Sequence, residues 1–422
     1  MRLLKKLRDL FGNPKLPAHF CIMPWVHFHV TQYGTVTPCC QAPWQEEQAF
    51  GNMNRSTLSQ VWTGDKINAF RKNMLHGKAD ARCQGCFKKE KAGFTSLRQI
   101  TNKNYAHKIP IVQHSAQNGE SWTTPPVYFD IRFSNVCNLK CRICGPWSSS
   151  SWFRDAARLN MLGERRQAMT YAFDNADHFF NEFEQLIDTL EEIYFAGGEP
   201  LVMNEHYRLL ELLIKHNKTD VKLVYNTNFS SFNYRNTDVI ALWKQFSRVN
   251  IAASLDASRQ RGELLRKNLK WEDVLANRRL LLEQLPHIEF TVSATLNAYN
   301  LLHLPDFHLE WLQQRLISVE DLIPTLLIHP VELSISSLPR AFREKALTVY
   351  NKHIEHISNL PYRNAEKREH MLQQFKSVIT CLQNTTGEGS AESLGKSSLA
   401  VDALRDERTT EIFPELKELL EA

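Results

Sequence analysis

The sequence predicts an α/β fold: a partial, TIM-like (β/α)6 barrel, preceded by a small cysteine-rich domain and followed by a helical region. Between residues 127 and 340, short β-rich apolar runs alternate with longer helical stretches. Right-handed crossovers turn such an alternation into a parallel sheet. Cysteines cluster in the first hundred residues, and the pattern is helical from about residue 341.

The N-terminal part is expected to contain a helix, a cysteine-rich domain and a linker. Residues 1–20 are predicted to form an amphipathic helix, because apolar side chains share one helical face. These are Leu3, Leu4, Leu7, Leu10 and Phe11. The cysteine-rich domain is expected at 21–100. Residues 101–126 are polar and end in Pro-Pro, which indicates a linker.

The barrel is expected over residues 127–340, with six strands. The predicted strands cover 127–134, 192–197, 221–227, 249–256, 288–296 and 324–335. The C-terminal region, 341–422, is predicted to be helical. A Gly/Ser-rich stretch at 384–398 is expected to interrupt it as a flexible loop.

Composition and charge restrict the class of protein. A net charge of +5 over 422 residues is mildly basic, which does not argue for a nucleic-acid partner. No apolar run approaches the roughly 18 residues of a membrane span. The N-terminus lacks the apolar stretch and cleavage site of a signal peptide, so a cytoplasmic location is expected. In that reducing compartment, clustered cysteines are metal ligands more often than disulfides.

Three cysteines follow the first predicted strand, in the stretch SNVCNLKCRICGPW. They are Cys137, Cys141 and Cys144. Thiolates are soft ligands that suit zinc and iron–sulfur clusters. A closed structural zinc site needs four ligands, whereas three thiolates leave one iron of a cubane cluster open. The alternative is a zinc site that a distant fourth ligand completes.

The wider stretch IRFSNVCNLKCRICGPWSSSSW resembles the signature of radical S-adenosylmethionine (radical SAM) enzymes. The resemblance implies that Cys137, Cys141 and Cys144 hold a 4Fe–4S cluster whose open iron binds S-adenosylmethionine. Reductive cleavage of this cofactor then gives methionine and a 5′-deoxyadenosyl radical, which abstracts hydrogen from a substrate carbon. One departure is Ile143, where the family often has an aromatic residue.

The second predicted strand ends in YFAGGEP, which contains Gly197, Gly198 and Glu199. Two glycines let the backbone approach a ligand closely, and a carboxylate suits a cationic amine. By the resemblance, this stretch contacts the methionyl amino group of S-adenosylmethionine.

Short polar side chains end the next three predicted strands. They are Thr227, Asn228, Ser254, Asp256, Ser293 and Asn297. Such side chains suit hydrogen bonds to ribose hydroxyls and to the cofactor carboxylate. The alternative is that each one caps the loop that follows its strand.

The N-terminal cysteines resemble the auxiliary-cluster module called SPASM, or its shortened twitch form. The resemblance implies that Cys21, Cys39, Cys83 and Cys86 hold an auxiliary 4Fe–4S cluster. Cys40 is an alternative to Cys39 as ligand. The other interpretation of the same four cysteines is a zinc knuckle.

Together, these resemblances imply an oxidoreductase or maturase that oxidises, or forms a bond on, a peptide or small molecule. The auxiliary cluster would accept the second electron, and flavodoxin or ferredoxin would be the external donor. No catalytic side chain is assigned beyond the cluster ligands. The alternative function is a non-catalytic iron–sulfur electron carrier or redox sensor. The AGGEP and SLDA segments argue against it, because a carrier has no need of a nucleoside pocket.

Overall fold

The protein was analysed as a computed structural model, which describes residues 16–91, 95–117, 122–385 and 391–421. The predicted N-terminal helix lies almost entirely outside the described residues. The chain divides into two compact units. Unit 1 comprises residues 1–131 and 172–191, and unit 2 comprises residues 132–171 and 192–422.

Unit 1 contains a small mixed sheet. Strand β1 (His27–Val30) pairs in parallel with β4 (Tyr128–Ile131) and antiparallel with β2 (Thr35–Thr37), which pairs with β3 (Gly51–Asn52). The first predicted barrel strand is β4, and it belongs to this unit. The helices are α2 (Met23–Val26), α3 (Leu58–Trp62), α4 (Asp65–Leu75), α5 (Gln84–Lys91), α6 (Leu97–Asn104), α7 (Ile109–Gln117) and α9 (Ala176–Glu184).

The segment predicted as a linker, 101–126, is helical through residue 117 apart from short turns. A capping box between Ser96 and Gln99 starts α6, and such boxes satisfy the unpaired amides of a helix N-terminus. Pro110 lies in the first turn of α7, where no amide donor is needed. The polar composition therefore gave no indication of helices α6 and α7. Each helix buries a side chain, Thr101 in α6 and Val112 in α7.

Unit 2 contains a five-stranded parallel sheet in the order β13–β12–β10–β7–β6. Its strands are β6 (Glu192–Phe195), β7 (Lys222–Thr227), β10 (Val249–Ala253), β12 (Glu289–Leu296) and β13 (Leu322–Leu326). The helices that connect and flank them are α10 (Asn204–Lys215), α11 (Val239–Trp243), α12 (Arg259–Leu265), α13 (Trp271–Gln284) and α14 (Leu304–Gln313). The predicted α/β class is confirmed.

Short elements complete unit 2. They are the strands β5 (Lys140–Cys141), β11 (Arg266–Lys267), β8 (Asn233–Tyr234) and β9 (Thr237–Asp238), and the helix α8 (Phe153–Arg158). The last predicted strand, 324–335, is shorter than expected, because β13 ends at Leu326 and 3-10 turns follow from Val331. Pro330 has no amide with which to extend the strand ladder.

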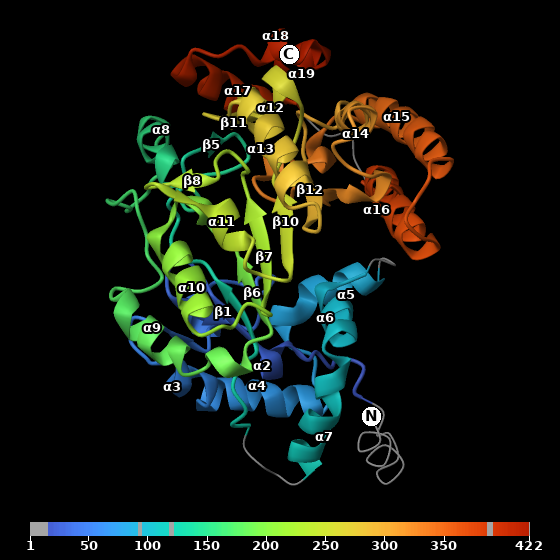
Figure 1. Ribbon diagram of the computed structural model, residues 1–422. Coiled ribbons are helices and arrows are strands. Elements are labelled where there is room, and N and C mark those ends of the chain that lie inside the picture. Colours follow the sequence, from blue (N-terminus) through green and yellow to red (C-terminus); the bar gives the residue numbers. More distant parts are fainter. Residues whose placement is uncertain (1–15, 92–94, 118–121, 386–390, 422) are drawn as a thin grey trace. The chain divides into compact units, whose positions relative to one another are not determined.

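The C-terminal region is helical, as predicted (Figure 1). It contains α15 (Arg340–Ser358), α16 (Ala365–Asn384), α17 (Glu392–Arg405), α18 (Thr409–Ile412) and α19 (Lys417–Leu420). No helix among the described residues is long and apolar enough to span a membrane.

The prediction of a flexible loop at 384–398 is wrong for its C-terminal part, because helix α17 begins at Glu392 and includes residues 392–398. Residues 386–390 lie outside the described part. Gly395 packs against the end of α19, where an added Cβ would lie 3.1 Å from the Leu420 carbonyl oxygen. The small residues of this stretch thus permit close helix packing, and tertiary contact overrides weak helix propensity.

Candidate functional site

The three-cysteine loop folds so that its thiols converge. Cys141 lies on β5, which pairs antiparallel with β11. The Cys144 amide donates to the Cys141 carbonyl oxygen at 3.0 Å. Outside the loop, the Ser149 hydroxyl donates to the Leu139 carbonyl (2.7 Å), and the Trp152 indole donates to that of Cys141 (2.8 Å). These bonds fix the backbone between the cysteines.

The electrostatics of the thiols fit a metal cluster. Burial, reinforced by the neighbouring Cys141, raises the pKa of the Cys137 thiol to about 12. The hydrogen bond between Cys141 and Cys144 lowers the pKa of Cys141 and raises that of Cys144. Cys141 is buried and Cys137 and Cys144 are half-buried, and three such thiols that interact with one another need a strong cationic centre if all are to ionise. Soft thiolate donors suit the iron of a 4Fe–4S cluster.

No group of three or more His, Cys, Asp or Glu side chains in the described ranges gathers tightly enough for a single metal ion. A 4Fe–4S cluster takes one thiolate per iron, so its ligands stand farther apart than those of one ion.

The end of β6 is joined directly to the cysteine loop. The Glu199 amide donates to the Val136 carbonyl oxygen at 2.7 Å. Gly197 and Gly198 have φ values of +79° and +39°, which favour glycine. A Cβ at Gly198 would lie 2.1 Å from the Val136 oxygen. Only glycine therefore allows this strand end to approach the loop.

The Glu199 carboxylate connects the ends of β6 and β7. It is 1% exposed and accepts hydrogen bonds from the Thr227 hydroxyl (2.7 Å) and the Asn228 amide (2.5 Å). The Leu201 amide adds a third at 3.0 Å. Burial raises the pKa of Glu199 to about 7, and these hydrogen bonds oppose the rise. The structure thus brings Glu199, Thr227 and Asn228 together.

Asn228 reaches the cysteine loop through its side chain. Its amide nitrogen donates to the Asn138 side-chain oxygen at 2.8 Å and lies 3.9 Å from the Cys137 sulfur. Asn228 therefore supports the loop between Cys137 and Cys141.

Asp256 contacts a cation that sequence reasoning missed. Arg266 lies 2.9 Å from the Asp256 carboxylate and donates to the Cys141 sulfur at 3.8 Å. The Thr295 amide donates to the other carboxylate oxygen at 2.8 Å. Asp256 thus orients a buried guanidinium beside a predicted cluster ligand, an arrangement typical of tuned metal sites. No sequence motif marks Arg266, because 125 residues separate it from Cys141.

The remaining predicted residues divide between two roles. Asn297 is buried and caps its own turn: its side chain accepts from the Tyr299 amide (3.0 Å) and donates to the Thr295 carbonyl (2.8 Å). Ser254 and Ser293 are half-buried. The capping alternative therefore describes Asn297, and also Thr227 and Asn228, whose side chains accept from the Phe229 and Ser230 amides at 3.0 Å. The two serines stay accessible.

One face of the parallel sheet is half-buried and polar. Burial alternates along β7, so Tyr225 and Thr227 lie on the fully buried face and Asn226 on the other. Asn226 pairs in register with Ala252, and Ala252 with Thr291. Thr291 and Ser293 share this accessible face by the same alternation. Sequence analysis named Thr227 and missed Asn226, which strict alternation from the apolar Leu223 and Tyr225 could have found.

In unit 1, the four predicted auxiliary ligands line one cavity. They are Cys21, Cys39, Cys83 and Cys86. Cys40 is absent from the lining, although it influences the pKa of Cys39. Burial raises the pKa of Cys21 and of Cys83 to about 12, and Cys86 adds to both shifts. Four thiols around one cavity suit a fully ligated 4Fe–4S cluster.

Comparison with protein families identifies both regions. Residues 131–306 match the model of the radical SAM superfamily, and residues 21–87 match SPASM, an iron–sulfur cluster-binding domain. The chain carries a SPASM domain followed by a radical SAM domain. The predicted family is confirmed. The cofactors follow from the two domains: a 4Fe–4S cluster with S-adenosylmethionine, and auxiliary iron–sulfur binding.

Three solved structures illustrate the similarity. One is anSMEcpe with bound AdoMet and the Cp18Cys peptide: 17% identity, TM-score 0.39, 56% of this chain and 62% of that chain. Another is Streptococcus suis SuiB bound to precursor peptide SuiA, with 15% identity and a TM-score of 0.36; the match covers 79% of this chain and 69% of that chain. The third is TYW1 with a lysine-pyruvate adduct bound, with 14% identity and a TM-score of 0.29; the match covers 58% of this chain and 76% of that chain. The chain spans less than two thirds of the anSMEcpe chain. No curated protein matches.

The cavity predicts different outcomes for two adjacent cysteines. Cys39→Ala should lower iron and sulfide from about eight to about four of each per chain, because the auxiliary cluster loses a ligand. Cys40→Ala, the matched control, should keep the wild-type content. Iron and sulfide analysis after anaerobic reconstitution measures both, and the reverse pattern would make Cys40 the ligand.

The polar sheet face predicts a contribution of Asn226 to cofactor binding. Asn226→Ala should weaken S-adenosylmethionine binding about fivefold, as expected for loss of one hydrogen bond worth about 1 kcal/mol. Asn250 lies on the same face near the opposite end of its strand and bonds Glu289, so Asn250→Ala is the control. Anaerobic equilibrium dialysis gives both dissociation constants, and equal values for the two variants would remove Asn226 from the site.

Proposed function

We propose that the chain is a radical SAM enzyme that oxidises, or forms a carbon–carbon or carbon–heteroatom bond on, a peptide or small molecule. The observation that carries the proposal is the direct contact between the glycine pair at the end of β6 and the three-cysteine loop. A backbone without side chains lets the end of β6 pack directly on the loop, and this places the Glu199 carboxylate where it acts on Cys137.

When bound, the cluster would supply the electron that cleaves S-adenosylmethionine to methionine and a 5′-deoxyadenosyl radical, which would remove hydrogen from the substrate. Cys137, Cys141 and Cys144 would hold this cluster. Arg266 places a positive charge beside Cys141, which favours the more reduced, more negative state of the cluster.

Glu199 binds the cofactor amine in this proposal. A carboxylate has about four lone-pair sites, and three hydrogen bonds from the protein leave one for a cationic amine. A bound ammonium would also keep the buried carboxylate ionised. Asn226, Ser254 and Ser293 offer hydrogen bonds to the ribose and carboxylate from the accessible sheet face.

An auxiliary cluster would accept the second electron. Cys21, Cys39, Cys83 and Cys86 line one cavity and would supply one thiolate for each iron, which would leave no position for a substrate. A fully ligated cluster suits electron transfer. Flavodoxin or ferredoxin would supply the first electron, and the reducing environment that the thiols need suits the cytoplasm.

Two cysteine substitutions test the proposal. Cys141→Ala should abolish formation of 5′-deoxyadenosine from S-adenosylmethionine, because the cluster that binds the cofactor loses a ligand. Cys83→Ala removes only an auxiliary ligand, so cleavage should continue without coupling to product. Anaerobic incubation with dithionite, followed by liquid chromatography and mass spectrometry, measures 5′-deoxyadenosine.

The two outcomes also separate an enzyme from an electron carrier. A wild-type protein that holds both clusters yet forms no 5′-deoxyadenosine would support the carrier or sensor function instead.

A further inference from the structure

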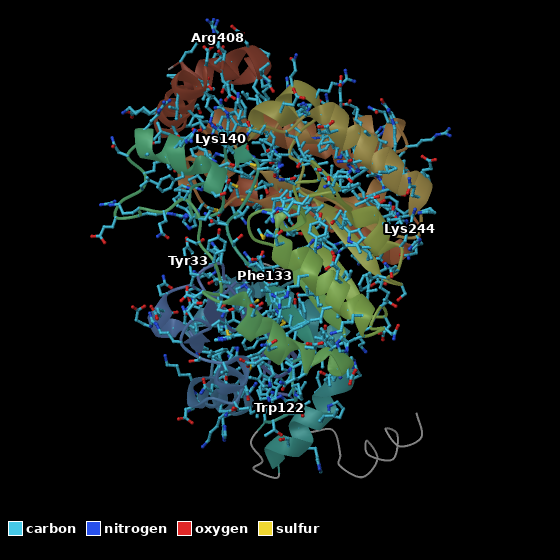
Figure 2. The ribbon with its side chains drawn as sticks, turned by 60° about the vertical axis from the view of Figure 1, so that its left-hand side comes forward. Tyr33, Trp122, Phe133, Lys140, Lys244 and Arg408 are labelled. Atoms are coloured by element: carbon cyan, nitrogen blue, oxygen red, sulfur yellow. The ribbon has the colours of Figure 1, made fainter. Side chains whose placement is uncertain are left out.

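The two residues that flank Cys141, Lys140 and Arg142, are both bound by the C-terminal segment. The residues responsible are Asp402 and Arg405, at the end of α17, and Glu407, just after it; we call these three the tail anchor. Figure 2 shows Lys140 at the end of unit 2 where the C-terminal helices lie. The contacts on each side of Cys141 involve separate ionic groups.

On one side, Arg142 forms ion pairs with the carboxylates of Asp402 and Glu407. Its side chain is 1% exposed, and its Nη2 donates to Asp402 and, at 2.6 Å, to Glu407. Glu407 also accepts from Lys267 at 2.7 Å. Lys267 lies on β11, the strand that pairs with Cys141. Two cations and two carboxylates therefore neutralise one another next to the loop.

The orientation of Asp402 is fixed from its own segment. Its carboxylate accepts from the amide and from the hydroxyl of Thr409, each at 2.8 Å. The anion that meets Arg142 is thus held in place before any contact with the loop.

On the other side, Arg405 connects α17 to Lys140. Its Nη1 donates to the Lys140 carbonyl oxygen, and its Nε donates to Asp155, both at 2.9 Å. Asp155 also binds the Lys140 ammonium at 2.9 Å. The Arg405 guanidinium lies 4.4 Å from the ring centre of Trp152, whose indole donates to Cys141. The tail anchor thus binds the loop on both sides of the predicted ligand Cys141.

We propose that the tail anchor positions the cysteine loop for its cluster, so that cluster assembly and docking of α17 stabilise each other. The proposal rests on the proposed assignment of Cys137, Cys141 and Cys144 as ligands. If docking favours the cluster-binding form of the loop, the cluster must favour docking by the same free energy. Asp402, Arg405 and Glu407 are positioning residues, because they act through the loop backbone and Arg142.

A matched pair of variants tests the tail anchor. Glu407→Gln removes one of the two charges that meet Arg142. Glu415→Gln removes an ion pair to Arg261 of α12 at 2.7 Å, which also ties the C-terminal segment to the rest of unit 2 but does not touch the loop. Both are made in a Cys83→Ala background, so that the remaining iron reports on the cluster in the loop.

The first measurement is the rate of iron loss to a chelator under anaerobic conditions. Glu407→Gln should release iron roughly tenfold faster than the parent, as expected for loss of a charged hydrogen bond, whereas Glu415→Gln should match the parent. Arg142→Lys keeps the charge but replaces the guanidinium whose Nη2 reaches both carboxylates, so it should give an intermediate rate. Because a single guanidinium nitrogen bonds both carboxylates in the parent, Arg142→Lys is also a mild variant should Glu407→Gln fold poorly.

The second measurement is hydrogen exchange of α17 amides before and after cluster reconstitution. Reconstitution should slow exchange in the parent and in Glu415→Gln, but much less in Glu407→Gln and, in part, in Arg142→Lys. Equal iron-loss rates in the two glutamate variants, with α17 exchange unchanged by the cluster, would overturn the proposal. A parent that takes up no iron in the loop would instead refute the ligand assignment itself.

Discussion

The proposed site depends on one constraint: a short loop must bring three thiols together and keep a fourth coordination position clear. Burying thiolates is unfavourable unless a cation compensates them, so the loop must be rigid before its cluster can form. The protein supplies that rigidity from three directions. The backbone of Gly198 packs against Val136. Cys141 is contacted by Arg266 and by strand β11, and the Trp152 indole donates to the Cys141 carbonyl oxygen.

The same constraint explains why predicted cofactor residues are occupied by contacts within the protein. Glu199 joins β6 to β7, and Asp256 holds Arg266 beside Cys141. Both carboxylates arrange the walls of the site. Glu199 keeps one acceptor position for the proposed cofactor amine, and the accessible polar face of the sheet remains for the rest of the ligand. In unit 1 the arrangement differs, because four thiols close around one cavity and need no open position.

Features set by local spacing could be predicted from the sequence. Strands β6, β7, β10 and β12 follow from alternation with helical stretches. The cysteine ligand sets, which the family resemblance implies, stay predictions. Features set by distant packing could not. Arg142 meets Asp402 across 260 residues, and Arg266 meets Cys141 across 125. Helices α7 and α17 were missed because their polar or Gly/Ser-rich segments become helical through contacts that local composition does not reveal.

The central claim is that one iron held by the loop has no protein ligand. Mössbauer spectroscopy of the ⁵⁷Fe-reconstituted Cys83→Ala protein, with and without S-adenosylmethionine, tests it most directly. The account predicts that the cofactor changes the signal of about one iron in four, the iron without a cysteine. A spectrum with four equivalent irons that S-adenosylmethionine leaves unchanged would contradict it.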